Sequence, residues 1–219
     1  MFIFLHNGIF AIYMKKANFK TKKTMKRILT IAVFIFSFMF VMAQTPNSHL
    51  TFKGIPITGT IESFARELGS KGFEKIYSDK SCVGFEGEFA GYSGCKIYVH
   101  KIPNRNIVYK VVVIFPKKSS WANLEKEYYK FKGMLSNKYG EPALQSETFR
   151  EGASTFSDEA KMLSLKKGNC DYYSQWGVDN GFIKVDIASI IDTNDGRIIL
   201  GYFDKINDAL ADKAKADDL

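Results

Sequence analysis

Hydrophobic positions follow two different periods along this chain, and each change of period marks an expected element. Apolar residues recur every three or four positions in two stretches, which is the spacing of a single helix face. The pattern predicts a short helix between Thr60 and Gly72, and a long one over Trp121–Tyr139 that begins after Ser119 or Ser120.

Two groups of β-rich segments follow these helices. The first spans residues 73–115, where apolar and polar positions alternate and turn-forming clusters separate the segments. The second spans residues 170–203 and contains two hairpin signals, Asn180-Gly181 and Asp195-Gly196. The sequence therefore predicts an α+β fold in which helices pack on antiparallel sheet meanders.

Two weaker helices are expected in the second half. Ser157 can cap a short helix that ends at Gly168, with Ala160 and Leu163 facing inward, and with Met162 as a further inward candidate. Residues 204–219 are charged and rich in alanine, which predicts a C-terminal helix that faces solvent.

The two β groups resemble each other. Four apolar positions of the first recur in the second after 87 and then 86 residues, pairing Phe85, Phe89, Ile97 and Val99 with Tyr172, Trp176, Ile183 and Val185. The chain thus divides into two helix-plus-meander half-units, residues 50–118 and 119–204. Chance similarity between amphipathic hairpins is the alternative interpretation.

The charge of the chain is concentrated at one end. The net charge is +8, but seven of the 31 cations and none of the 23 anions precede residue 44. Residues 44–219 therefore carry 24 cations against 23 anions, and this near-neutral balance argues against a nucleic-acid partner. About 176 residues suffice for one α+β domain.

Residues 25–43 have the three parts of a secretory signal peptide: a basic start, an apolar run and a Val41-x-Ala43 end. We expect cleavage after Ala43 and a location in the periplasm or outside the cell. An uncleaved leader that anchors the protein is the alternative. Residues 1–24 fit a leader poorly and indicate an over-extended start, with Met1, Met14 and Met25 as the candidate first residues.

Residues with the chemistry of a metal or catalytic site are sparse. Outside the leader the histidines are His49 and His100, and His100 is expected to be an exposed strand residue. No zinc-ligand spacing or nucleophile elbow occurs, and the sequence predicts no cofactor, no metal and no catalytic residue. Glu86 and Glu88 share a strand face, so a dispersed acid pair is the enzymatic alternative.

Three cysteines remain after the leader. In an oxidising compartment they allow at most one internal disulfide among Cys82, Cys95 and Cys170, and the sequence does not decide which pair.

Aromatic residues give the remaining candidates for a binding site, because flat rings suit glycan or peptide ligands. Tyr173 and Trp176 lie on one predicted strand close to a turn. Strand alternation places Tyr173 opposite Tyr172 and Trp176, so Trp176 has core packing as its alternative role and Tyr173 is the exposed candidate.

Two resemblances accompany these residues. The strings FKGIPITG, FAGYSGC and KYGEP resemble a group of uncharacterised small exported proteins of Gram-negative gut commensals, which implies export but supplies no catalytic residues. The order of helices and meanders is similar, at fold level only, to the tandem architecture of beta-lactamase inhibitor proteins.

These observations predict a small exported protein that works by binding a protein or glycan partner, without a catalytic site of its own. Two alternatives remain: a hydrolase acting on glycans or peptides through a dispersed acid pair, and a membrane-anchored accessory protein that contacts the membrane only through its leader.

Overall fold

The computed structural model describes residues 48–216. The expected over-extended start (residues 1–24), the signal peptide (25–43) and the cleavage position after Ala43 lie outside the described residues. The chain divides into two units after Ser48, and the structure below is that of the second unit, from His49 onward.

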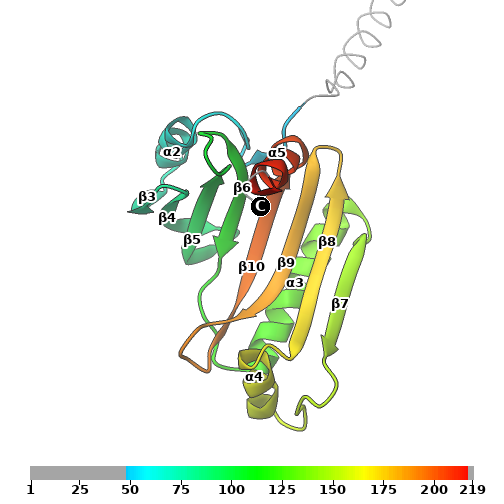
Figure 1. Ribbon diagram of the computed structural model, residues 1–219. Helices are drawn as coiled ribbons and strands as arrows, with labels where there is room; N and C mark the ends of the chain where they lie inside the picture. The colour runs from blue at the N-terminus through cyan, green and yellow to red at the C-terminus, as the bar shows by residue number, and fades with distance from the viewer. Residues whose placement is uncertain (1–47, 217–219) are drawn as a thin grey trace, which may run out of the picture. The chain divides into compact units, whose positions relative to one another are not determined.

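One eight-stranded antiparallel sheet organises this unit (Figure 1). The strand order is β3-β4-β5-β6-β10-β9-β8-β7, so β6 and β10, the last strands of the two meanders, pair at the centre. The strands are β3 (Glu74–Ser78), β4 (Cys82–Phe89), β5 (Tyr92–Lys101), β6 (Val108–Ile114), β7 (Leu144–Phe149), β8 (Cys170–Val178), β9 (Gly181–Ser189) and β10 (Gly196–Asp204). The α+β fold with antiparallel meanders is confirmed.

The matched strands of the two meanders occupy equivalent positions. Counting outward from the centre, β5 corresponds to β9 and β4 to β8. The paired apolar positions of the sequence fall on these strands, with Ile97 and Val99 on β5 and Ile183 and Val185 on β9, and all four are buried.

Four helices accompany the sheet: α2 (Ile61–Ser70), α3 (Trp121–Tyr139), α4 (Asp158–Lys166) and α5 (Lys205–Ala216). The N-caps of α2, α3 and α4 are Thr60, Ser120 and Ser157. Each cap side-chain oxygen accepts one hydrogen bond from the backbone N–H three positions further along the chain. The bounds of α3 coincide with those that its apolar stripe predicts.

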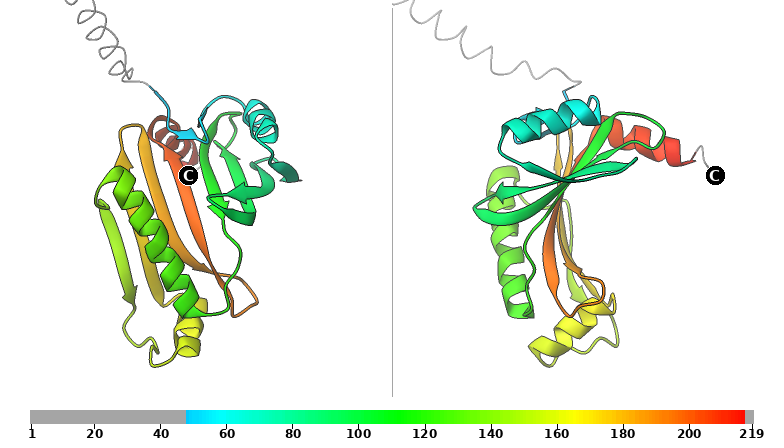
Figure 2. Two further views of the ribbon diagram at one scale, coloured as in Figure 1. Left: turned by 180° about the vertical axis from the view of Figure 1, so that it is seen from behind. Right: turned by 90° about the vertical axis from the view of Figure 1, so that its left-hand side faces the viewer.

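Helices α3 and α5 lie on opposite sides of the sheet (Figure 2). We call the face under α2 and α3 the covered face and the other the open face. The long helix packs its buried side chains on β8, β9 and β10, while α5 lies at one end of the open face beside β6.

Two helical predictions need correction. In α4, Leu163 is 46% exposed, whereas Met162 and Leu165 are buried. The inward face of α4 is therefore rotated relative to the prediction, because this helix packs on α3 as well as on the sheet. Helix α5 is not simply solvent-facing, since its Asn207 and Ala211 are buried.

The first extended segment of the described residues is a small hairpin. Strands β1 (Thr51–Phe52) and β2 (Ile55–Pro56) pair across a turn in which Lys53 and Gly54 both have positive φ. This turn places Phe52 in the core, where its ring stacks on Phe89 at 5.4 Å.

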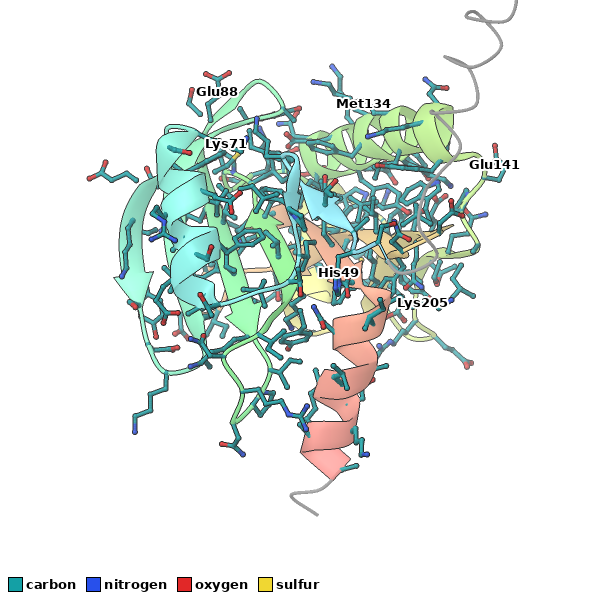
Figure 3. The ribbon with its side chains drawn as sticks, turned by 90° about the horizontal axis from the view of Figure 1, so that it is seen from above. His49, Lys71, Glu88, Met134, Glu141 and Lys205 are labelled. Carbon is teal, nitrogen blue, oxygen red and sulfur yellow. The ribbon has the colours of Figure 1, made fainter. Side chains whose placement is uncertain are left out.

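A buried polar cluster joins this hairpin segment to the start of α5. His49 lies beside Lys205 at the beginning of that helix (Figure 3). The Asp204 carboxylate is completely buried, where it faces His49 Nδ1 at 3.0 Å and accepts hydrogen bonds from the backbone N–H groups of Leu50 and Asn207. Asn207 Nδ2 in turn donates to the carbonyls of Ile57 and Val108. Because the donors converge on one carboxylate and the Asn207 amide donates to two carbonyls, the cluster fixes both ends of the domain on the central strands.

Candidate binding surface

The open face is built from rows of residues that lie opposite each other on successive strands. The middle row runs from β5 to β8 through Lys96, Ile114, Ile199, Asp186 and Tyr173. The next row toward α5 contains Tyr98, Val112, Gly201, Lys184 and Gln175. No helix lies on these two rows, and their side chains are mostly half-buried by one another.

Two glycines leave room for aromatic rings on this face. A Cβ at Gly84 would meet the Tyr98 ring at 3.0 Å, and one at Gly201 would meet the Phe203 ring at 2.5 Å. Phe182 stacks on Phe203 with centroids 4.3 Å apart and planes 10° apart. The glycines therefore have a specific role, which is to let these rings approach the strand backbone closely.

The charges at the centre of the open face are mostly positive. On this face the four central strands, β5, β6, β10 and β9, present one anion, Asp186, and the cations Lys96, Lys110, Lys184 and Arg197. The neighbouring strand β4 adds Glu86, which lies directly opposite Lys96. Lys184 is already engaged, because its Nζ lies 2.5 Å from Asp186 Oδ1 and 4.7 Å from the Tyr173 ring centroid. Burial raises the pKa of Asp186 in spite of this lysine.

His100 differs from its expected exposed state. It is half-buried on the open face opposite Lys110, and burial, helped by the Lys110 charge, lowers the pKa of His100 to about 4. The imidazole is therefore neutral at physiological pH and adds no charge to the face.

A pocket of about 250 Å³ lies at the end of the open face away from α5. Its walls come from β5, the end of β6, the β9–β10 loop and the start of β10, through Gly94, Lys96, Ile114, Phe115, Pro116, Lys117, Ile190 and Arg197. The chain beyond β6 stays bonded to β10 here, since Phe115 N donates to Ile198 O and Lys118 N to Gly196 O. Arg197 is thereby held beside Pro116.

The cations of this pocket are not equivalent. Lys117 Nζ is paired with Asp195 Oδ2 at 2.7 Å. Within the described part of the chain, Lys96 and Arg197 form no ion pair, and Arg197 Nε is buried without a hydrogen-bond partner. A buried guanidinium N–H without an acceptor is unusual in a folded protein, and it makes Arg197 the most distinctive group of the face.

The structure places Tyr173 and Trp176 on opposite faces of β8. Tyr173 is half-buried on the open face, while Trp176 is completely buried under the end of α3 and donates from Nε1 to Gly140 O at 2.9 Å. Tyr172 shares the covered face and contacts Trp121 and Tyr128. The two candidates of the sequence therefore do not form one surface.

The cysteines and the acid pair are dispersed. All three cysteines are free. Cys82 pairs with His100 and Cys95 with Gly87, so their positions on the β4–β5 ladder are roughly 16 Å apart along the strands. That separation exceeds the reach of a disulfide. Glu86 and Glu88 are exposed with a β-bulge beside them, and Glu88 points outward at the edge of the domain (Figure 3).

The sequence patterns did not single out one buried carboxylate on α3. Glu127 is 7% exposed, and neither of its oxygens has a hydrogen bond. Its ion pair with Lys118 is long, at 3.5 Å. The signal was present, because Glu127 follows Leu124 by three positions and so falls on the apolar stripe.

A second polar group links α3 to the edge strand β7. The Glu147 carboxylate accepts from Tyr128 and Tyr129 and pairs with Lys132, and Tyr128 lies 2.7 Å from Ser174 Oγ. Ser174 is buried, so the cluster fastens β7 to the helix and offers no accessible nucleophile.

Comparison with protein families, curated proteins and solved structures gives no match to this chain. Within residues 48–216, no helix is both long and apolar enough to cross a membrane, and no cluster of three metal-ligating side chains occurs.

Proposed function

We propose that this is a small exported binding protein that holds a protein partner on the open face of its sheet and performs no catalysis. The observation that carries the proposal is the composition of that face, where the rings beside Gly84 and Gly201 lie near Lys96 and Arg197, two cations that form no ion pair among the described residues. Half-buried rings next to such cations are typical of a contact surface.

The size of the face favours a protein over a small ligand. The two helix-free rows cross the five strands from β5 to β8, roughly 19 Å at about 4.8 Å per strand, and the strands β4, β3 and β7 continue the sheet beyond them on both sides. A protein partner contributes about 800 Å² to an interface of standard size. A glycan chain would use a narrower strip of such a surface.

The charge of the face defines the chemistry of the partner. Lys96, Lys110 and Arg197 have no carboxylate bound to them among the described residues, so a complementary surface presents acidic groups around an apolar centre. The aromatic rings supply the apolar contacts that dominate interface energies.

The signal-peptide pattern at residues 25–43 supports export, with cleavage after Ala43 and a location in the periplasm or outside the cell. Retention of the leader as an anchor would leave the binding proposal unchanged and would tether the protein to a membrane.

Photo-crosslinking in the producing cells tests the proposal. A photoreactive residue at Tyr98 or Tyr173 should form a discrete adduct with one protein, whereas the same residue at Lys126, on the outward side of α3, should not. The identified protein, once purified, should bind the wild type and lose at least tenfold affinity for Val112→Asp, which adds a carboxylate to the centre of the face. Lys126→Asp is the matched control.

Three results would overturn the proposal. They are equal adducts at Lys126 and at the open face, no adduct at either open-face position, and specific binding of a glycan in place of a protein.

A further inference from the structure

The pocket at the end of the open face has two kinds of wall. Ile114, Phe115, Pro116 and Ile190 make up its apolar lining, and the cations Lys96 of β5 and Arg197 of β10 lie on the two strands that flank β6. Since Lys117 is already neutralised by Asp195, the cations without a carboxylate partner are one exposed lysine and one half-buried arginine.

Arg197 has unused hydrogen-bonding capacity. Its Nε is buried and has no acceptor, and among the described residues its two Nη groups form no ion pair and no hydrogen bond, so they keep N–H donors for the oxygens of a carboxylate.

We propose that this pocket binds one carboxylate side chain, a glutamate or aspartate, of the protein partner. The inference rests on the proposed function and names the anchor of that interface. The carboxylate accepts hydrogen bonds from the Nη groups of Arg197 and from the Lys96 ammonium, and its methylene stem packs on Ile114 and Pro116. No covalent bond forms or breaks.

A pair of isosteric peptides tests the anchor without the partner. The protein, ¹⁵N-labelled and purified in its processed form, is titrated with acetyl-Gly-Glu-Gly-amide or acetyl-Gly-Gln-Gly-amide at constant ionic strength. The Glu peptide should give saturable shifts of the Arg197 Nε–H and of the Gly94 and Gly196 amide signals. The Gln peptide should give at least tenfold weaker binding.

Two variants locate the binding, and a third is the control. Arg197→Gln and Lys96→Gln should each weaken binding of the Glu peptide at least fivefold, judged from the glycine amides. Arg150→Gln is the control, because Arg150 pairs with Asp171 and does not line the pocket. It should leave the affinity for the Glu peptide unchanged. Lys96→Gln keeps the test valid if Arg197→Gln fails to fold, because Lys96 is exposed.

Several outcomes would overturn the inference. Equal shifts with both peptides would mean that the pocket recognises only apolar groups. Glu-peptide binding that survives in Lys96→Gln and Arg197→Gln would place the site elsewhere. Propionate binding as tightly as the Glu peptide would indicate a site for a free small carboxylate rather than for a partner side chain. No saturable shift with either peptide would remove the site altogether.

The two proposals can fail separately. If the partner loses affinity for Val112→Asp but not for Arg197→Gln, the proposed binding face stands and the proposed carboxylate anchor is wrong. If the pocket binds a carboxylate but the protein forms no open-face adduct, the pocket proposal stands and the proposal of a protein partner is wrong.

Discussion

The two faces of the sheet use the same strands in different ways. On the covered face, β8, β9 and β10 direct Trp176, Val185 and Leu200 into a closed core beneath α3. On the open face, the alternate residues of these strands are half-buried and mix rings with charges, as at Tyr173 and Arg197. Strand alternation alone produces this division, because successive side chains point to opposite sides.

The glycines show how differently the two faces are filled. Gly196 leaves space for the core side chains of Leu124 and Leu165, which a Cβ would meet at 2.6 and 2.8 Å. Gly84 and Gly201 instead leave space for rings that remain partly exposed. The covered face thus uses close approach to exclude water, and the open face uses it to bring the Tyr98 and Phe203 rings close to the strand backbone.

The largest expected loss of stability follows removal of Trp176. Trp176→Ala deletes a completely buried ring and leaves Gly140 O without its donor, so the free energy of unfolding should fall by about 3–5 kcal/mol. Urea denaturation measures this. Gln175→Ala, the next residue and on the open face, is the control and should cost less than about 1 kcal/mol. Equal midpoints for the two variants would reverse the assignment of the faces.

A similar contrast is expected along α3. Leu124→Ala or Leu135→Ala should destabilise the protein by about 2–5 kcal/mol, because both side chains are buried in the core. Lys126→Ala lies on the outward side of the same helix and should change stability by no more than about 0.5 kcal/mol. If all three variants unfolded at one urea concentration, the apolar stripe would face solvent.

Glu127 is a buried charge on the covered face that is poorly compensated. Glu127→Met removes a buried carboxylate that has no hydrogen bond and whose ion-pair partner, Lys118, is 3.5 Å away, so it should be neutral or stabilising by about 1–4 kcal/mol. Lys118→Met should destabilise, since it leaves that carboxylate unpaired, and it should do so much less in the Glu127→Met background. Additive effects in this double-mutant cycle would show that the two charges do not interact.

The open face should give stability a pH dependence through His100. Burial lowers its pKa to about 4, below the value of about 6.5 in an unfolded chain, so the unfolded state binds the proton more strongly. The free energy of unfolding should therefore decrease as the pH falls from about 6.5 to about 4. His100→Gln should remove this part of the slope in urea titrations at several pH values. An unchanged slope would mean that His100 is exposed in solution.

Local patterns predicted local structure well. The bounds of α3 follow from its apolar stripe, and the caps Thr60, Ser120 and Ser157 follow from their positions before helical patterns. The opposite orientations of Tyr173 and Trp176 also follow from strand alternation. Each of these features depends on residues that are close in sequence.

Features that depend on distant residues could not be predicted. The pairing of β6 with β10 brings together segments about 90 residues apart, and the pocket exists only because of it. Arg197 appears in the sequence as an ordinary strand cation. His100 is half-buried because β6 and β10 extend the sheet beside it, and α5 has a buried face because Asn207 meets carbonyls from β6 and the N-terminal hairpin segment.

The affinity of Tyr173→Ala for the crosslinked partner tests the division between the faces most directly. This variant loses one half-exposed ring and its contact with Lys184, so its stability should stay within about 1 kcal/mol of the wild type. Its affinity should fall at least tenfold, whereas the folded fraction of Trp176→Ala should bind as the wild type does. Full affinity in Tyr173→Ala together with a loss in folded Trp176→Ala would contradict the account.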